Sequence, residues 1–372
     1  MNTKSERNSN FEILRILTMF FIIGHHFSIH GGIPTSGMSN FNYFWYNFLI
    51  NGGKIGVLVF MLISGYFLSA SKKYKSSKAL GLFLQVLIYA NIMNLIFTII
   101  TGNCEISHKA IGCLVIPMGS KCWPFITQYF IILLLSPLLN KVINFITKKQ
   151  YKNFLIVFGA LLVVGPTFST LHIHNDFLTC LFMYLIGGYI RRFNVLIPVK
   201  SAKGIFYFLA FYTLITKLNC VLIKNNLSYL SNIFNLSDVN NLFSVLLGIL
   251  IFLSFKNMKP KYNKKINILS KAVFGIFLIH DFYRIRNFLW FDLFKNSQFA
   301  TSPYFALYSI FTIIIVFTVC IIISLIYNFT IGKLVDKFVK YLNDNYLYKI
   351  DNFINNINIF KINTKTKKRL IK

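Results

Sequence analysis

Apolar residues in this chain gather into long runs separated by short polar stretches. Most runs approach the roughly 20 residues that an α-helix needs to cross a hydrocarbon core about 30 Å thick. We therefore expect an all-α polytopic membrane protein with about ten transmembrane helices. The predicted spans are residues 11–30, 54–70, 79–101, 123–143, 154–171, 177–193, 204–223, 239–255, 270–290 and 304–328.

A basic, asparagine-rich tail follows the last predicted span. We take residues 1–330 as the transmembrane domain and 331–372 as the tail. Apolar residues recur in the tail at near-helical spacing, which favours a helix lying on the cytoplasmic membrane surface. These residues are Leu334, Val335, Phe338, Val339 and Leu342.

Charge is distributed unevenly among the loops of a chain that is 55% hydrophobic and carries a formal net charge of +29. Lysines and arginines concentrate in every second loop, at residues 72–78, 141–152, 191–203 and 256–271, and the loops between them hold few cations. By the positive-inside rule, both termini are then cytoplasmic. The basic excess is explained by topology and by attraction to the anionic inner leaflet, so we expect no nucleic-acid partner.

The first predicted span carries ionisable residues inside an apolar run: Glu12, Arg15, His25 and His26. Such residues are costly within a membrane and by default mark functional sites. Arg15 and His26 lie eleven positions apart, close to three helical turns, so their side chains point the same way. Glu12 lies one turn before Arg15, and His25 lies roughly 80° away from their shared face.

These residues suit two chemical roles. A neutral histidine such as His26 can take a proton from a hydroxyl group and release it later. Arg15, near the cytoplasmic end of its span, can bind an anionic ligand in bidentate fashion. The alternative is structural: Glu12 and Arg15 form a simple ion pair, and the histidines bond neighbouring helices.

A second polar cluster lies in the ninth predicted span, where His280 and Arg284 are four residues apart and share a helix face. Packed against the first span, this cluster would make a buried polar pocket. His26 and His30 have a metal-compatible spacing, but no carboxylate or cysteine lies near them in the sequence, so we expect no metal.

Three cysteines, Cys104, Cys113 and Cys122, share one predicted outer loop. They permit one disulfide with a thiol left over, and the sequence does not decide whether it forms.

Two stretches of the chain resemble the membrane acyltransferase family 3, the integral-membrane O-acyltransferases that modify bacterial cell-surface glycans. The first is residues 7–26, which include Glu12, Arg15 and His26, and the second is Gly53-Lys-Ile-Gly-Val-Leu-Val-Phe-Met-Leu-Ile-Ser-Gly-Tyr66-Phe-Leu. Weaker agreement occurs at residues 123–140, 183–191 and 274–280.

The resemblance implies a ten-helix O-acetyltransferase of the bacterial plasma membrane. It would move acetyl from cytoplasmic acetyl-CoA to a hydroxyl of a surface polysaccharide or lipid-linked glycan, such as exopolysaccharide, capsule or wall polymer, with no permanently bound cofactor. The family's essential arginine and histidine, eleven residues apart, map onto Arg15 and His26. We predict His26, Arg15 and Glu12 as catalytic residues, and His25, Tyr66, Trp123, His280 and Arg284 as pocket residues.

The chain departs from the family pattern in three ways. Glu12 stands where the family commonly has Asp, and the family's Arg-x-x-Arg near the third span has no counterpart in residues 78–85. In place of that motif, we expect Arg15, Lys72, Lys73 and Lys78 to contact coenzyme A. The chain also ends without the extracellular hydrolase-like domain that some relatives carry, so we expect the membrane domain or a separate extracytoplasmic transferase to complete transfer.

Two other functions use the same features. A transporter or flippase for lipid-linked sugars would use the buried charges as a conduit, although such proteins commonly show internal repeats that are not visible here. A scaffold of a glycan-assembly complex would need no catalytic histidine.

Overall fold

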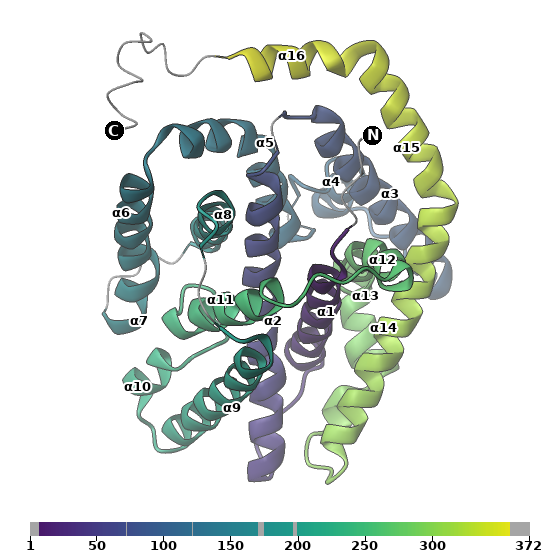
Figure 1. Ribbon diagram of the computed structural model, residues 1–372. Helices are drawn as coiled ribbons and strands as arrows, with labels where there is room; N and C mark the ends of the chain where they lie inside the picture. The colour runs from purple at the N-terminus through teal and green to yellow at the C-terminus, as the bar shows by residue number, and fades with distance from the viewer. Residues whose placement is uncertain (1–6, 72, 121, 170–174, 196–198, 358–372) are drawn as a thin grey trace.

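A computed structural model describes residues 7–71, 73–120, 122–169, 175–195 and 199–357, and it contains helices but no strand in those residues (Figure 1). The helices in the first half are α1 (Ser9–His30), α2 (Asn40–Leu68), α3 (Ser76–Thr101), α4 (His108–Val115), α5 (Pro124–Phe145), α6 (Lys148–Gly159), η1 (Ala160–Val164), α7 (Gly165–Phe168) and α8 (Asp176–Arg192). The second half contains α9 (Ser201–Lys224), α10 (Ser228–Ile233), α11 (Leu242–Lys256), α12 (Lys264–His280), α13 (Tyr283–Asn287), η2 (Phe288–Leu293), η3 (Asn296–Phe299), α14 (Phe305–Phe329), α15 (Ile331–Leu342), η4 (Asn343–Leu347) and α16 (Tyr348–Asn356).

The fold class predicted from the hydrophobic pattern is confirmed. In the described part of the chain, seven helices are long and apolar enough to cross a membrane, and the bent pair formed by α12 and the segment Tyr283–Leu293 makes an eighth. The two remaining predicted spans form the shorter helices α8 and α11, of 17 and 15 residues. At 1.5 Å per residue α11 is only about 22 Å long, shorter than a hydrocarbon core of about 30 Å.

The second predicted span begins earlier than its apolar run indicates. Helix α2 starts at Asn40, within the residues expected to form an outer loop. Its first turns are rich in asparagine, and these amides have partners: Asn42 donates to the backbone oxygens of Ala300 and Ser302, and Asn51 donates to Thr216 Oγ1. The predicted boundary was wrong because contacts with α9 and with the segment before α14 satisfy polar groups that a hydropathy pattern treats as loop.

The basic loops meet at one end of the bundle. Arg192 donates to Asn144 O, which joins the end of α8 to the end of α5. Lys256 donates to Val195 O, and Ser9 N–H donates to Lys261 O, which places the start of α1 beside the loop before α12. The charge alternation therefore corresponds to one spatial end of the molecule, which we call the basic end.

The ninth predicted span is broken rather than continuous. Helix α12 ends at His280, and the next helical segment begins at Tyr283 with a bend of 72°. Helix α1 packs against both α12 and α2, so the break lies beside the polar residues of the first span. The bend changes which residues of the ninth span can reach those of the first.

Helices α2 and α8 cross at very close range. Each helix has a glycine at the crossing, Gly65 on α2 and Gly187 on α8. A Cβ atom added at Gly65 would overlap the backbone of Tyr184, and one added at Gly187 would overlap Leu62 O. Close backbone approach at glycine is the usual way in which membrane helices gain packing contacts. This crossing holds α2 in place beside α1.

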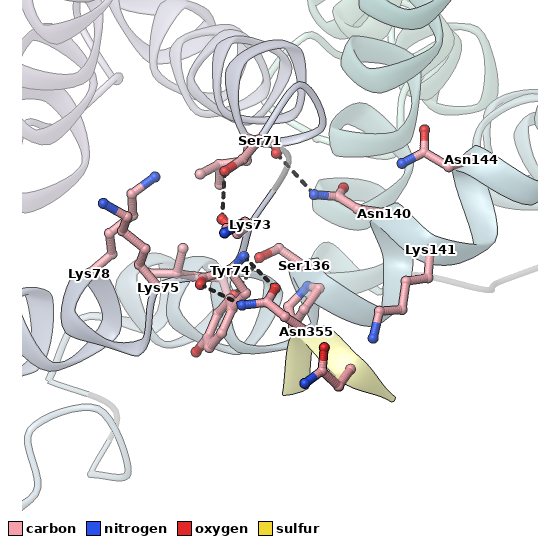
Figure 2. A pocket seen from close by; sticks show the side chains of 14 residues that line it. Ser71, Lys73, Tyr74, Lys75, Lys78, Ser136, Asn140, Lys141, Asn144 and Asn355 are labelled. Carbon is pink, nitrogen blue, oxygen red and sulfur yellow. Dashed lines mark hydrogen bonds between the residues drawn. The ribbon is translucent and has the colours of Figure 1, made fainter. Parts of the chain in front are cut away.

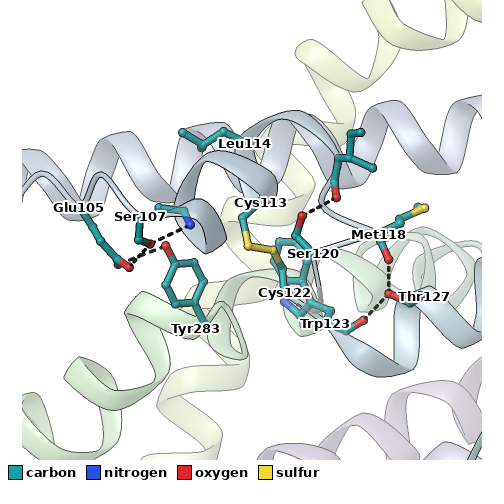
Figure 3. Close-up of a disulfide and its surroundings, with 12 residues drawn as sticks. Glu105, Ser107, Cys113, Leu114, Met118, Ser120, Cys122, Trp123, Thr127 and Tyr283 are labelled. Atoms are coloured by element: carbon teal, nitrogen blue, oxygen red, sulfur yellow. Dashed lines mark hydrogen bonds between the residues drawn. A yellow bond between two sulfur atoms is a disulfide. The ribbon is translucent and has the colours of Figure 1, made fainter.

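The segment between α3 and α5 is fixed by a disulfide between Cys113 and Cys122, and Cys104 is a free, exposed thiol (Figure 3). Figure 3 also shows Tyr283, at the start of α13, donating to Glu105 in the same segment. The disulfide that the sequence left open is therefore present, with the odd thiol outside it.

In the described residues, α15, η4 and α16 follow the last span. Helix α15 packs against α3 and α14. Helix α16 is drawn in yellow at the top of Figure 1. The predicted helix in the tail is confirmed over Ile331–Leu342; its position on a membrane surface remains a prediction.

Candidate active site

His26 is buried near the end of α1 and forms a chain of hydrogen bonds with α12. Its Nδ1 lies 2.9 Å from Nε2 of His280, and Nδ1 of His280 lies 2.6 Å from Ile276 O. A backbone carbonyl can only accept, so His280 carries its proton on Nδ1. In its neutral form His280 then accepts at Nε2, and His26 must donate from Nδ1.

This arrangement fixes the tautomer of His26. With the proton of neutral His26 on Nδ1, its Nε2 holds a lone pair and can accept a proton. Metal ligands and catalytic histidines are commonly oriented in the same way, by a hydrogen bond at the other ring nitrogen. The contact between His26 and His280 joins residues that are 254 positions apart, and it confirms that the polar clusters of the first and ninth spans meet.

His25 faces a different helix. Its Nδ1 lies 2.6 Å from Ile50 O on α2, and its side chain packs where Gly53 has no Cβ atom. The two neighbouring histidines therefore have separate environments, as their angular offset on the helix predicts. Only His26 contacts α12 through a ring nitrogen.

A carboxylate completes the histidine cluster. Asp281 Oδ1 lies 3.7 Å from Nδ1 of His26, 3.9 Å from Nε2 of His30, and 3.3 Å from Nη1 of Arg286. The expectation that no carboxylate lies near His26 and His30 was wrong, because the ninth span brings Asp281 to them. His26, His30 and Asp281 could hold a metal ion by their ligand types and spacing, but the guanidinium of Arg286 already neutralises the carboxylate.

Glu12 and Arg15 form the local pair that their spacing predicts. Glu12 Oε1 accepts from Arg15 Nη1 at 2.6 Å, and the same carboxylate accepts two hydrogen bonds from Arg7 at 2.7 and 2.8 Å. Glu12 is buried, whereas Arg15 is half-buried. Because both of its oxygens are occupied, Glu12 holds Arg15 in position rather than offering a free base.

Arg15 lines a cavity of about 310 Å³ between α1, α2, α3, α5 and α12. The cavity reaches from Arg7 and Arg15 to the aromatic residues Phe125 and Phe277. The ring of Phe277 lies 6.1 Å from the ring of His26 and 6.0 Å from that of His280. Arg15 and His26 are about 16 Å apart along α1. On that helix the cavity is lined by Arg15, Met19 and Ile22, so it extends from the arginine towards His26, which is not among its lining residues.

Three of the predicted pocket residues lie elsewhere. Tyr66 accepts a hydrogen bond from Arg191 at the basic end. Trp123 is buried against Phe282 at the start of α5. Arg284 does not join His280, since the break after α12 turns it towards the end of α3.

There Arg284 contacts α3, where it also lies over the ring of Phe97, and the segment after α3. It donates to Asn94 Oδ1 at 2.6 Å, Thr98 Oγ1 at 3.2 Å and Asn103 O at 2.5 Å, and lies 3.7 Å from Glu105. The predicted shared face of His280 and Arg284 was therefore wrong, because it required an unbroken helix.

Of the expected coenzyme A contacts, Lys73 and Lys78 line a cavity at the basic end (Figure 2), and Lys72 lies outside the described residues. A larger cavity of about 630 Å³ shares Lys78 with this one and shares Leu82, Gln85 and Tyr129 with the Arg15 cavity. The lysines and Arg15 therefore line neighbouring cavities along α3 that share wall residues.

The family model for acyltransferase family 3, described as an acyltransferase domain, matches residues 8–326. No curated protein and no solved structure matches the chain. The matched residues include the histidine cluster, Arg15 and every predicted span up to α14. Since the match covers most of the sequence, the chain belongs to acyltransferase family 3 and is a membrane acyltransferase.

Proposed function

We propose that this protein is an O-acetyltransferase of the bacterial plasma membrane, which moves acetyl from acetyl-CoA at the basic end to a hydroxyl of a surface polysaccharide or lipid-linked glycan. The observation that carries the proposal is the hydrogen-bond chain from His26 through His280 to Ile276 O, which leaves Nε2 of His26 as an acceptor. A histidine held in one tautomer is suited to take a proton from a hydroxyl.

The donor enters through the adjoining cavities along α3. Lysines at the outer cavity and Arg15 at the inner one attract the anionic groups of coenzyme A, and Arg15 is held by Glu12 in a fixed orientation. The thioester then extends towards Phe277, whose ring contacts the rings of His26 and His280. This route allows the acyl group to approach His26 while the nucleotide stays at the basic end.

His26 supplies the proton transfer. The acceptor oxygen attacks the thioester carbonyl carbon, Nε2 of His26 takes the hydroxyl proton, the C–S bond breaks, and the proton passes to the departing thiolate. The same atom could instead carry the acetyl group briefly as an acyl-histidine. In both sequences of steps, His280 keeps Nδ1 of His26 protonated and so keeps Nε2 in the reactive form.

The experiment compares surface glycans from cells with and without the protein by mass spectrometry, together with His26→Ala and His25→Ala variants at matched membrane levels. We expect an acetyl-sized mass difference that His26→Ala removes, since loss of a general base typically lowers a rate by about 10² to 10⁴. His25→Ala removes a hydrogen bond to α2 and leaves the bond between His26 and His280 in place, so it should retain part of the activity. If cells with the His26→Ala variant still showed the acetyl-sized mass difference, the result would support the scaffold function. A change in the amount of glycan without a mass difference would support a transporter.

A further inference from the structure

A polar cavity at the basic end has one wall from a helix that lies outside the matched acyltransferase domain. This cavity, of about 310 Å³, has walls from the α2–α3 loop, from α5 and from α16 (Figure 2). The family match ends at residue 326, and α16 covers Tyr348–Asn356. The C-terminal extension therefore contributes directly to a cavity that is otherwise built from the domain.

Helix α16 is fastened to the domain by side-chain bonds to the backbone. Asn355 accepts from Tyr74 N–H at 2.9 Å and donates to Tyr74 O at 3.2 Å, which pairs both backbone groups of one loop residue. Lys141 on α5 donates to Ile354 O and Ile357 O at 2.6 and 2.8 Å. The contacts come from both other walls of the cavity, so α16 is held as a wall rather than resting on the surface.

The chemistry of the cavity suits an anion. Four lysines, Lys73, Lys75, Lys78 and Lys141, line it together with asparagine and serine side chains, and no carboxylate is among its described lining residues. At the edge, the N–H of Ser76 in the first turn of α3 donates to the carboxylate of Asp351 at 2.7 Å. The start of α3 is thus already paired with one anionic group, as the partial positive charge of a helix N-terminus favours.

The cavity also lies at the outer end of the donor route. It shares Leu68, Lys78 and Leu133 with the 630 Å³ cavity, which in turn adjoins the Arg15 cavity. A ligand bound here would have beside it, along α3, the two neighbouring cavities, the further of which is lined by Arg15 and Phe277. The position and the charge therefore point to the same class of ligand, a phosphate-bearing nucleotide attached to a chain.

We propose that this cavity binds the phosphate-bearing nucleotide half of acetyl-CoA, and that α16 forms an essential wall of that site. The inference rests on the proposed function, because it assumes that coenzyme A is the donor. It assigns a role to a segment beyond the family domain, and it places a binding role on Lys78 and Asn355 in a chain that lacks the family's Arg-x-x-Arg.

The test measures binding of coenzyme A and of pantetheine, which lacks the phosphates and the nucleotide, to the purified full chain in detergent. We expect Lys78→Gln to raise the Kd of coenzyme A about tenfold, because it removes one charge-assisted contact. Asn355→Ala should raise the same Kd several-fold by releasing α16. Neither change should alter the Kd of pantetheine.

Matched controls for both variants lie on α16, outside the cavity. Lys349→Gln removes an equal charge and Asn352→Ala an equal amide, and both residues are exposed, so neither should change coenzyme A binding. Unchanged affinity in both Lys78→Gln and Asn355→Ala, or equal losses for pantetheine, would overturn the inference. If the wild-type chain bound no coenzyme A, the proposed donor itself would be wrong, which separates the two failures. Should Asn355→Ala unfold, Lys78→Gln decides the question alone.

Discussion

The hydrogen bond from His26 to His280 gives a prediction whose size follows from the structure. His280→Leu places an apolar side chain of comparable length at this buried position and removes the acceptor, Nε2 of His280. The Nδ1–H of His26 then loses its partner in a buried site. A buried donor without a partner costs about 1–3 kcal/mol.

That cost falls on the reactive tautomer alone. In the other tautomer the proton of His26 moves to Nε2, and the atom that must accept the hydroxyl proton no longer can. A bias of 1–3 kcal/mol corresponds to a factor of about 5 to 150 in the population of the reactive form. We therefore expect kcat of the His280→Leu variant to fall by about 5- to 150-fold, with the KM for acetyl-CoA nearly unchanged, because His280 is not among the residues lining the donor cavities.

The assay follows the release of coenzyme A with a thiol reagent in membranes that contain the acceptor glycan. His280→Gln serves as the matched variant, since its side-chain oxygen reaches the place of Nε2 and can accept from His26. It should recover much of the rate that His280→Leu loses. Thermal unfolding of both variants in detergent controls for a general loss of structure.

Asp281 is the competing acceptor, 3.7 Å from the same nitrogen of His26. If Asp281 were the group that orients His26, Asp281→Asn would lower kcat and His280→Leu would not. A His280→Leu variant with the wild-type rate, or a His280→Gln variant as slow as His280→Leu, would refute the tautomer argument. A parallel fall of kcat and of thermal stability in both His280 variants would point to packing alone.

Three further predictions concern the donor site, the topology and the packing of the bundle. Arg15→Lys should lower kcat/KM for acetyl-CoA about tenfold, because a point charge cannot reproduce the planar fork, and unchanged kinetics would contradict its binding role. Cysteines introduced at Lys75 and Lys261 should react with membrane-impermeant reagents only after the cells are opened; labelling in intact cells would contradict the predicted cytoplasmic basic end. Gly65→Ala should lower the thermal unfolding temperature, since overpacking costs about 1–3 kcal/mol or more against a backbone, whereas Gly81→Ala, with open space around it, should leave it equal or higher.

The sequence by itself determined the features that depend on local periodicity and on hydropathy. Long apolar runs can only be satisfied in a membrane as helices, so the ten helical segments and the fold class were predictable. The ion pair of Glu12 and Arg15 follows from a separation of three residues, and the common face of Arg15 and His26 from a separation of eleven. The gathering of the basic loops at one end follows from charge alternation.

The tertiary structure alone decided which distant residues meet. The bond between His26 and His280 and the approach of Asp281 to His30 depend on how α12 packs against α1. The break after His280 then sent Arg284 to α3, against a prediction that assumed one continuous helix. A helix break is set by contacts at both sides of the bend, which no pattern within a single segment records.

The wall formed by α16 illustrates the same limit at the other end of the chain. The near-helical spacing of residues 334–342 indicated α15 and not α16, and nothing local shows that Asn355 pairs with Tyr74, 281 residues away. Backbone groups in a loop can accept any well-placed amide, so the partner is selected by where α15 directs the chain along α3. Local propensity therefore determined the elements of this protein, and the packing of those elements determined its site.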